Sequence, residues 1–203
     1  ASHLKKQLSG LINIDGADVF KVLRFVSLTG GMPNLAGKDP AGHMLLIRDT
    51  KPEIYAKTHK FLNVLDYLNL RLTGEFVASF DSIVTSWVTD NRNPNELRYN
   101  DGLISILGID RAKLPDVVAC SAVIGNVKAD VANVLGLSND VKVVAGSIDN
   151  TASAIGSGAV EDFHPHLYIG TSSWITAHVP FKKTDIGSSL ASIPCAVPDK
   201  YLL

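Results

Sequence analysis

The sequence predicts an α/β fold, in which helices pack against layers of strands. Before Val141, apolar residues recur mostly at the three- and four-residue spacing of helix faces. From Val141 onward, short β-branched runs alternate with glycine-containing turns and one helical stretch. A change from helical to strand–helix–strand patterning favours a layered α/β arrangement over an all-helical bundle.

The first helices are predicted from apolar spacing and from signals at their ends. A helix is expected to begin after the turn of Asp15 and Gly16 and to end at Gly30, since glycine is favoured just after a helix. Pro40 and Pro52 are each expected in the first turn of a further helix, where the missing N–H costs no hydrogen bond. The apolar face predicted for the first helix consists of Val19, Phe20, Val22, Leu23 and Val26.

Another helix is predicted to end at Gly74, although the alternate leucines of its second half would by themselves also fit a strand. Residues 73–92 are expected to form a long polar and aromatic segment. Two short helices are predicted to end at Gly108 and Gly136, and strands are expected after Val117. The apolar residues that predict the helix before Gly74 are Phe61, Leu62, Leu65, Leu68 and Leu72.

Composition limits the classes of function. The 203 residues are 46% hydrophobic and 19% charged, which is enough apolar material for a core. A formal net charge of −1 offers no basic field for nucleic acid or an anionic membrane, so neither partner is expected. No apolar run reaches the ~18 residues of a membrane span and no signal-peptide pattern is recognised, so a cytoplasmic location is expected. Cys120 and Cys195 lack metal-ligand spacing, so free thiols and no metal site are predicted.

The most informative stretch surrounds Asp149 and Asn150. A buried strand is predicted over residues 141–145, and either Asp149 or Asn150 is expected to cap a helix that begins at Thr151. The dipole of that helix favours the charged form of a carboxylate at its start. Asp149 is therefore a candidate to accept a proton from a hydroxyl nucleophile. The alternative is that Asp149 is only an N-cap.

A second candidate is the turn Gly170-Thr171-Ser172-Ser173. Strands are predicted on both sides of it, over residues 167–169 and 174–179, so the turn suits a tight hairpin. Its backbone N–H groups and hydroxyls can hold phosphate oxygens. The alternative is a plain turn, because hairpins of this composition are common. An acidic residue at a strand end with a small polar turn nearby is consistent with phosphoryl transfer, but neither stretch establishes it alone.

Several blocks of the sequence match one known family together. The most specific block is Asp-Tyr-Leu-Asn-Leu-Arg-Leu-Thr-Gly at residues 66–74. The other blocks are residues 20–25, 28–31, 37–43, 52–55, 149–150 and 170–174. With these blocks the chain resembles the FGGY carbohydrate kinases, most closely their xylulokinase branch, along nearly its whole length.

The resemblance implies the two-domain actin-like ATPase (ribonuclease H-like) fold, of which this chain is an incomplete part. It implies that Asp149 is the base on the sugar hydroxyl, with Asn150 also at the substrate. The same resemblance implies that Gly170, Thr171 and Ser172 contact nucleotide phosphates, with ATP and its Mg²⁺ as cofactors and a sugar as substrate. Ile148 departs from the family, whose members have more glycine before the catalytic Asp.

The resemblance also implies a domain boundary. Residues 1–158 correspond to the second half of the N-terminal sugar-binding domain, and residues 159–203 to the start of the C-terminal nucleotide-binding domain. The first phosphate hairpin, a Trp-x-Asp-x-Arg sugar segment and the adenosine-binding segment of relatives are absent from these residues. The chain by itself is therefore expected to be inactive.

The expected function of the full-length protein is ATP-dependent phosphorylation of D-xylulose to xylulose 5-phosphate. One alternative is a kinase of the same family for glycerol, gluconate, ribulose or another sugar or polyol. A second alternative is a noncatalytic binding module with the same fold. A homodimer paired through exposed strand edges is also expected.

Two further acidic positions fall in the segment predicted to be polar and aromatic. Asp81 and the run Asp90-Asn91-Arg92 lie in a region that lines the substrate side in the resembling family. A surface loop, or a turn at Asn93 and Pro94, explains them equally well.

Overall fold

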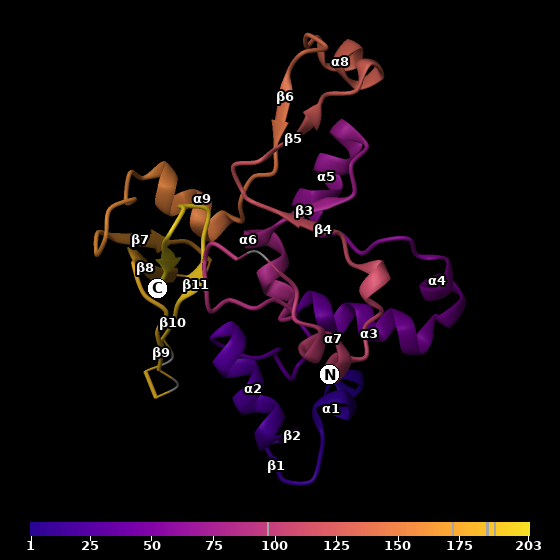
Figure 1. The fold of residues 1–203 in the computed structure, drawn as a ribbon, viewed down its shortest axis with the longest axis vertical. Coiled ribbons are helices and arrows are strands. Elements are labelled where there is room, and N and C mark those ends of the chain that lie inside the picture. Colours follow the sequence, from indigo (N-terminus) through magenta and orange to yellow (C-terminus); the bar gives the residue numbers. More distant parts are fainter. Residues whose placement is uncertain (97, 172, 186, 189) are drawn as a thin grey trace.

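The computed structural model describes residues 1–96, 98–171, 173–185, 187–188 and 190–203 (Figure 1). The α-helices are α1 (Ser2–Leu8), α2 (Val19–Thr29), α3 (Pro40–Thr50), α4 (Pro52–Lys57), α5 (Val64–Thr73), α6 (Phe80–Ile83), α7 (Asp101–Leu107), α8 (Ala129–Leu135) and α9 (Asp149–Gly156). The 3₁₀ turns are η1 (Val84–Ser86) and η2 (Arg111–Lys113). The strands are β1 (Asn13–Ile14), β2 (Ala17–Asp18), β3 (Val77–Ser79), β4 (Asp116–Val118), β5 (Val123–Asn126), β6 (Lys142–Val144), β7 (Pro165–Ile169), β8 (Ser173–Val179), β9 (Thr184–Asp185), β10 (Leu190–Ala191), β11 (Ile193–Pro194) and β12 (Tyr201–Leu202).

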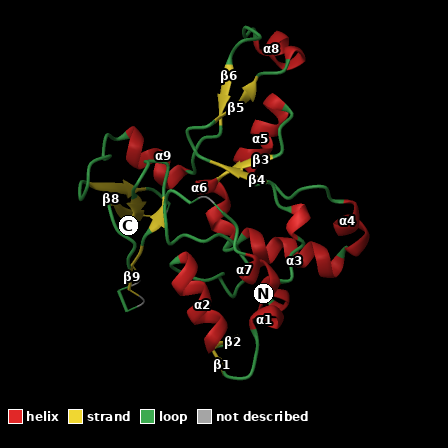
Figure 2. Ribbon diagram, in the orientation of Figure 1, coloured by secondary structure: helices red, strands yellow, loops and turns green. Residues whose placement is uncertain are grey.

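The described strands form several small sheets (Figure 2). β3 and β4 pair in parallel, and β5 pairs with β6 in antiparallel orientation. Near the C-terminus, a four-stranded antiparallel sheet has the order β11-β12-β8-β7. Helix α5 contacts β3, β5 and β6, so it joins two of the small sheets. The predicted α/β class is therefore confirmed.

The largest core lies among the N-terminal helices α1, α2, α3 and α7. Its side chains come from elements that are distant in the sequence. One smaller core lies beside β3 and α6, and another lies beside β5, β6 and α8. Among the described residues, no helix is long and apolar enough to cross a membrane. The larger fully buried side chains of the main core are Leu4, Leu8, Phe25, Leu45, Leu103, Leu107 and Leu114.

The predicted helix ends at glycine are confirmed. Each of these glycines follows its helix in the left-handed conformation, which L-residues with a Cβ adopt at a cost. Pro40 and Pro52 stand in the first turns of α3 and α4, as predicted. The glycines and their φ angles are Gly30 (95°), Gly74 (92°), Gly108 (65°) and Gly136 (68°).

The predicted buried face of α2 is wrong in part. Phe20 and Leu23 remain 67% and 57% exposed, whereas Phe25 and Leu28 enter the core. Helix α2 is apolar on more than one side, so spacing alone does not identify the side that meets the other helices. The helix begins at Val19 because the side chain of Asp18 accepts hydrogen bonds from two backbone N–H groups of its first turn.

The predicted polar and aromatic segment over residues 73–92 contains elements that the sequence does not predict. The segment contains β3, α6 and η1. β3 is only three residues long and pairs with β4, which lies far along the chain. A run this short carries no periodicity that sequence analysis can recognise.

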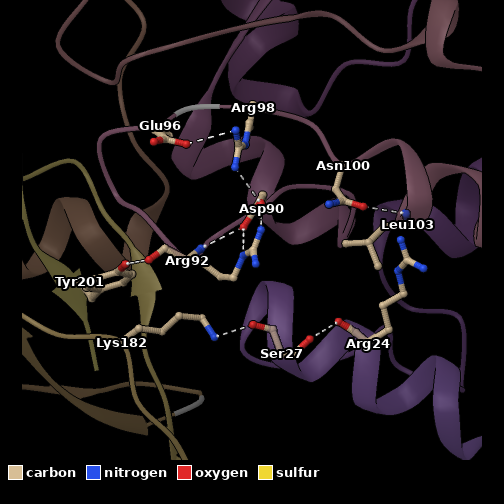
Figure 3. Close-up of polar contacts among 10 residues, drawn as sticks. All are labelled: Arg24, Ser27, Asp90, Arg92, Glu96, Arg98, Asn100, Leu103, Lys182 and Tyr201. Atoms are coloured by element: carbon tan, nitrogen blue, oxygen red, sulfur yellow. Dashed lines mark hydrogen bonds and ion pairs between the residues drawn. The ribbon is translucent and has the colours of Figure 1, made fainter.

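A polar network around Asp90 attaches the C-terminal segment to the helical part (Figure 3). Asp90 is buried and holds the guanidinium of Arg92 through two hydrogen bonds of 2.8 and 2.7 Å. These bonds lower the pKa of Asp90 to about 2. The carbonyl of Arg92 accepts a hydrogen bond from Tyr201 Oη at 2.7 Å, and Lys182 Nζ donates to a backbone carbonyl of α2. Asp90 is therefore a buried structural anchor rather than a surface-loop residue.

Candidate active site

Asp149 is the first residue of α9 and its carboxylate is exposed. The chain leaves β6, turns at Gly146 with a φ of 81°, and enters the helix with Ile148 as the N-cap. Asp149 Oδ1 accepts a hydrogen bond from the backbone N of the next residue, Asn150, at 2.9 Å. An exposed carboxylate at the start of a helix is available to a ligand and lies at the favourable end of the helix dipole.

The prediction that Asp149 or Asn150 caps a helix beginning at Thr151 is wrong. The helix begins two residues earlier, and the residue at the N-cap, Ile148, has no side-chain oxygen to cap it. Asp149 is therefore not the N-cap, which was the alternative to a functional role. A side chain from another part of the fold holds the first turn of the helix instead.

That side chain is Asp81, in α6. Asp81 Oδ2 accepts a hydrogen bond from the backbone N of Ile148 at 2.9 Å, and Oδ1 accepts one from Thr151 Oγ1 at 3.1 Å. The carboxylate is fully buried, and burial raises its pKa to about 6. Sequence reasoning missed this contact because nothing local links a residue to a helix 67 positions later.

Hydrogen bonds from Asn69 in α5 and to Cys120 also hold the loop before Asp149. Asn69 Nδ2 donates to the carbonyl of Ala145 at 2.8 Å, and the backbone N of Gly146 donates to the carbonyl of Cys120 at 2.9 Å. Asp66, three residues before Asn69, accepts hydrogen bonds from Ser79 and Ser82 at the start of α6. Two buried polar side chains of the block at residues 66–74 therefore fix the backbone around the candidate site.

The turn after β7 is present as predicted. Ile169 pairs with Ser173, which leaves Gly170 and Thr171 exposed in the turn. A Cβ on Gly170 would lie 2.8 Å from Tyr168 Oη, so a larger residue at this position would make the Tyr168 ring shift. Ser172, the third predicted phosphate contact, lies outside the residues that the structure describes.

An aromatic pair supports this turn. The rings of Tyr168 and Trp174 stack with centroids 4.0 Å apart and planes 11° from parallel. Within the described part of the chain, neither Asp149 nor Asn150 hydrogen-bonds to Gly170 or Thr171. The segment that follows α9 is instead linked to the far end of the hairpin, where His178 Nδ1 contacts the carbonyl of Ala159 at 2.6 Å.

Several buried polar atoms beside the candidate site lack a hydrogen-bond partner among the described residues. The pairing of His166 with Thr176 and of Tyr168 with Trp174 places these side chains on one face of the hairpin. Buried polar atoms of this kind are normally satisfied by water or a bound group. The atoms are Asn150 Oδ1, His166 Nε2, Trp174 Nε1, Thr176 Oγ1 and His178 Nε2.

The two cysteines are free thiols, as predicted. Burial raises the pKa of Cys120 to about 11 and that of Cys195 to about 12, so both are protonated near neutral pH. Within the described ranges, no three His, Cys, Asp or Glu side chains are grouped so that they could hold a metal ion.

Comparison with known proteins places these features in a family. The N-terminal domain of the FGGY family of carbohydrate kinases matches residues 37–156, a range that includes Asp81, Asp149 and Asn150. The xylulose kinase of Lactococcus lactis subsp. lactis (strain IL1403) is 30% identical over 137 residues, 68% of this chain and 27% of that protein. The chain thus spans about a quarter of the length of this relative.

Solved structures agree with the sequence match. Ligand-bound xylulose kinase from Lactobacillus acidophilus is similar with a TM-score of 0.78 and 27% identity, covering 90% of this chain and 36% of that chain. Gluconate kinase from Lactobacillus acidophilus is similar with a TM-score of 0.77 and 27% identity, covering 89% and 36%. The chain therefore has part of the actin-like ATPase fold of these kinases, as the resemblance implies.

Proposed function

The chain belongs to the FGGY family of carbohydrate kinases, and on that premise we propose that its protein transfers the γ-phosphoryl group of ATP to a sugar hydroxyl. Asp149 accepts the proton of that hydroxyl. The observation that carries the proposal is the exposed carboxylate of Asp149, presented at the start of α9 by a loop that Asp81 and Asn69 hold.

The chemistry needs few groups from the protein. Phosphoryl transfer depends mainly on in-line placement and on neutralisation of charge, and the proton of the acceptor is removed late. A carboxylate that is a modest base therefore suffices. When bound with the nucleotide, Mg²⁺ supplies charge neutralisation at the phosphates.

We propose that the nucleotide phosphates bind at the turn of Gly170, Thr171 and Ser172. The exposure of Gly170 and Thr171 in the turn supports this role. In this proposal, residues 1–158 belong to the sugar-binding domain and residues 159–203 begin the nucleotide-binding domain. The chain alone then lacks part of both ligand sites and has no measurable turnover.

D-Xylulose is the proposed substrate, with xylulose 5-phosphate as product. The names of the relatives support it, because xylulose kinases stand among both the sequence relatives and the solved structures. Gluconate is the second candidate, because the gluconate kinase structure is as similar as the xylulose kinase structures.

The test is a panel of sugars offered with ATP to the complete protein, with ADP release as the readout. Turnover that is highest with D-xylulose supports the proposal, and turnover highest with gluconate favours the second candidate. If no sugar or polyol stimulates ADP release, the chain belongs to a noncatalytic module and the proposed function is wrong.

A further inference from the structure

We propose that Asp81 is a positioning residue for Asp149, because its carboxylate holds the backbone immediately before Asp149 and the side chain two residues after it. This inference rests on the proposed function, in which Asp149 is the base. It adds a residue that does not touch the substrate and acts through the helix that carries Asp149.

The geometry shows how Asp81 acts. Both of its oxygens are used, one by the backbone N of Ile148 and one by the hydroxyl of Thr151, so the first turn of α9 is held at two points. Ile148 has no side chain able to cap the helix, and Asp81, from α6, accepts the hydrogen bond of the Ile148 N–H itself. If Asp81 were removed, the N–H of Ile148 would lose its partner and the direction of the Asp149 carboxylate would no longer be fixed.

The cost of burying Asp81 also indicates a role beyond packing. Its carboxylate is fully buried, and its hydrogen-bond donors are a backbone N–H and a hydroxyl, both uncharged. A buried charge without an opposite charge beside it destabilises the folded state. Groups that bear such a cost are concentrated at functional sites.

The surroundings of Asp81 couple it to Asp149. The ionisable groups that face it are Asp149 from α9, Cys120 from the loop after β4 and Cys195 from the C-terminal segment. Burial is the main cause that raises the pKa of Asp81 to about 6, and the negative charge of Asp149 raises it further. Asp81 therefore changes its charge near pH 6 while it holds the first turn of α9.

Two substitutions separate positioning from charge. Asp81→Asn keeps an acceptor for Ile148, and its amide can donate to the hydroxyl of Thr151, which can reverse its role. Asp81→Ala removes both contacts. Asp18→Ala is the matched control, because Asp18 is also buried and also holds the first turn of a helix, α2, whose other contacts are remote from α9.

The experiment measures kcat and KM of the complete protein from about pH 5 to 8 with its best sugar. We expect Asp81→Ala to lower kcat by about tenfold or more with a nearly unchanged KM, and Asp18→Ala to leave kcat close to that of the wild type. Asp81→Asn, which keeps an acceptor for the Ile148 N–H, is expected to retain most of the wild-type kcat. Equal kcat in Asp81→Ala and Asp18→Ala would overturn the inference.

A second readout is independent of activity. Hydrogen exchange at the Ile148 amide directly reports its hydrogen bond to Asp81. Thr151→Val removes only the other hydrogen bond, between Thr151 and Asp81. Protection of that amide in the wild type and in Asp81→Asn, with faster exchange in Asp81→Ala, supports positioning. Unchanged exchange in Asp81→Ala contradicts it.

Failure of Asp149→Asn to lower turnover would refute the base assignment of the proposed function, whatever the Asp81 contacts show.

Discussion

The side-chain amide of Asn69 donates a hydrogen bond of 2.8 Å to the carbonyl of Ala145, in the interior of the protein. It ties α5 to the last residue before the turn that leads to Asp149. Because both groups are buried, each depends on the other for its hydrogen bond. The contact shows what Asn69, a residue of the 66–74 block, does in the structure: it fixes the backbone beside the candidate site.

Asn69→Ala is expected to lower the free energy of unfolding by about 1–3 kcal/mol, because the carbonyl of Ala145 is left buried without a donor. The measurement is denaturant unfolding of the chain. Asn13→Ala is the matched control, since Asn13 donates to the carbonyl of Gly10 at the same 2.8 Å but on the surface. Its effect is expected to stay within about 0.5 kcal/mol. Equal losses in the two variants would contradict the structural role of Asn69.

Asp149→Asn is expected to lower the turnover of the complete protein by roughly 10²-fold or more, because it removes the proton acceptor at constant size. The affinities for sugar and ATP are expected to change much less. Since Asp149 is exposed, the thermal midpoint should hardly move. Asp130→Asn, at an exposed carboxylate in the first turn of α8, provides the control for loss of charge. A stable Asp149→Asn protein with normal turnover would end the base assignment.

The stability of the chain is expected to fall as the pH rises from about 4 to about 7, because Asp81 ionises in the folded state with a pKa of about 6 rather than 3.8. Between these values the folded state binds more protons than the unfolded state, so proton loss favours unfolding. The loss amounts to at most about 3 kcal/mol. Urea unfolding over this range measures it.

Asp81→Asn supplies the control for that pH dependence. The variant cannot ionise at this position, so its stability should change less between about pH 4 and 7 than that of the wild type. Asp66, whose pKa burial also raises, contributes in the same direction and remains in both proteins. Identical pH profiles for the variant and the wild type would show that Asp81 is not the group responsible.

The chain alone is expected to self-associate through β7, which lies at the edge of its sheet. The outer face there carries Leu167, Ile169 and Ile175 with 58%, 77% and 70% of their surfaces exposed. A lysine at an edge strand opposes pairing. Ile169→Lys should therefore reduce the molar mass found by light scattering, whereas Leu11→Lys, at a 98% exposed site away from β7, should not. A monomeric wild-type chain would refute this expectation.

The sequence predicts features with local causes. Glycine ends α2, α5, α7 and α8, and proline opens α3 and α4, because each effect depends only on the backbone of the residue itself. The hairpin of β7 and β8 follows from two alternating runs around a short turn. Asp149 stands out in the sequence as a candidate because its strand, turn and helix are adjacent along the chain.

The features that sequence reasoning misses depend on distant partners. Asp66 and Asn69 are the buried residues of α5, although the leucines of that helix are the more apolar side chains. Their burial becomes favourable only when Ser79, Ser82 and Ala145 arrive as hydrogen-bond partners. The contacts of Asp81 have the same character, so periodicity and composition cannot reveal them.

The long separation of these partners has a consequence for refolding. The bonds that place the loop before Asp149 close chain segments of 76 residues, from Asn69 to Ala145, and 67 residues, from Asp81 to Ile148. Contacts between residues so far apart form slowly, since the entropy of closing the loop is lost before the contact stabilises it. We therefore expect the N-terminal helices to form first during refolding, and the loop before Asp149 to be fixed among the last events.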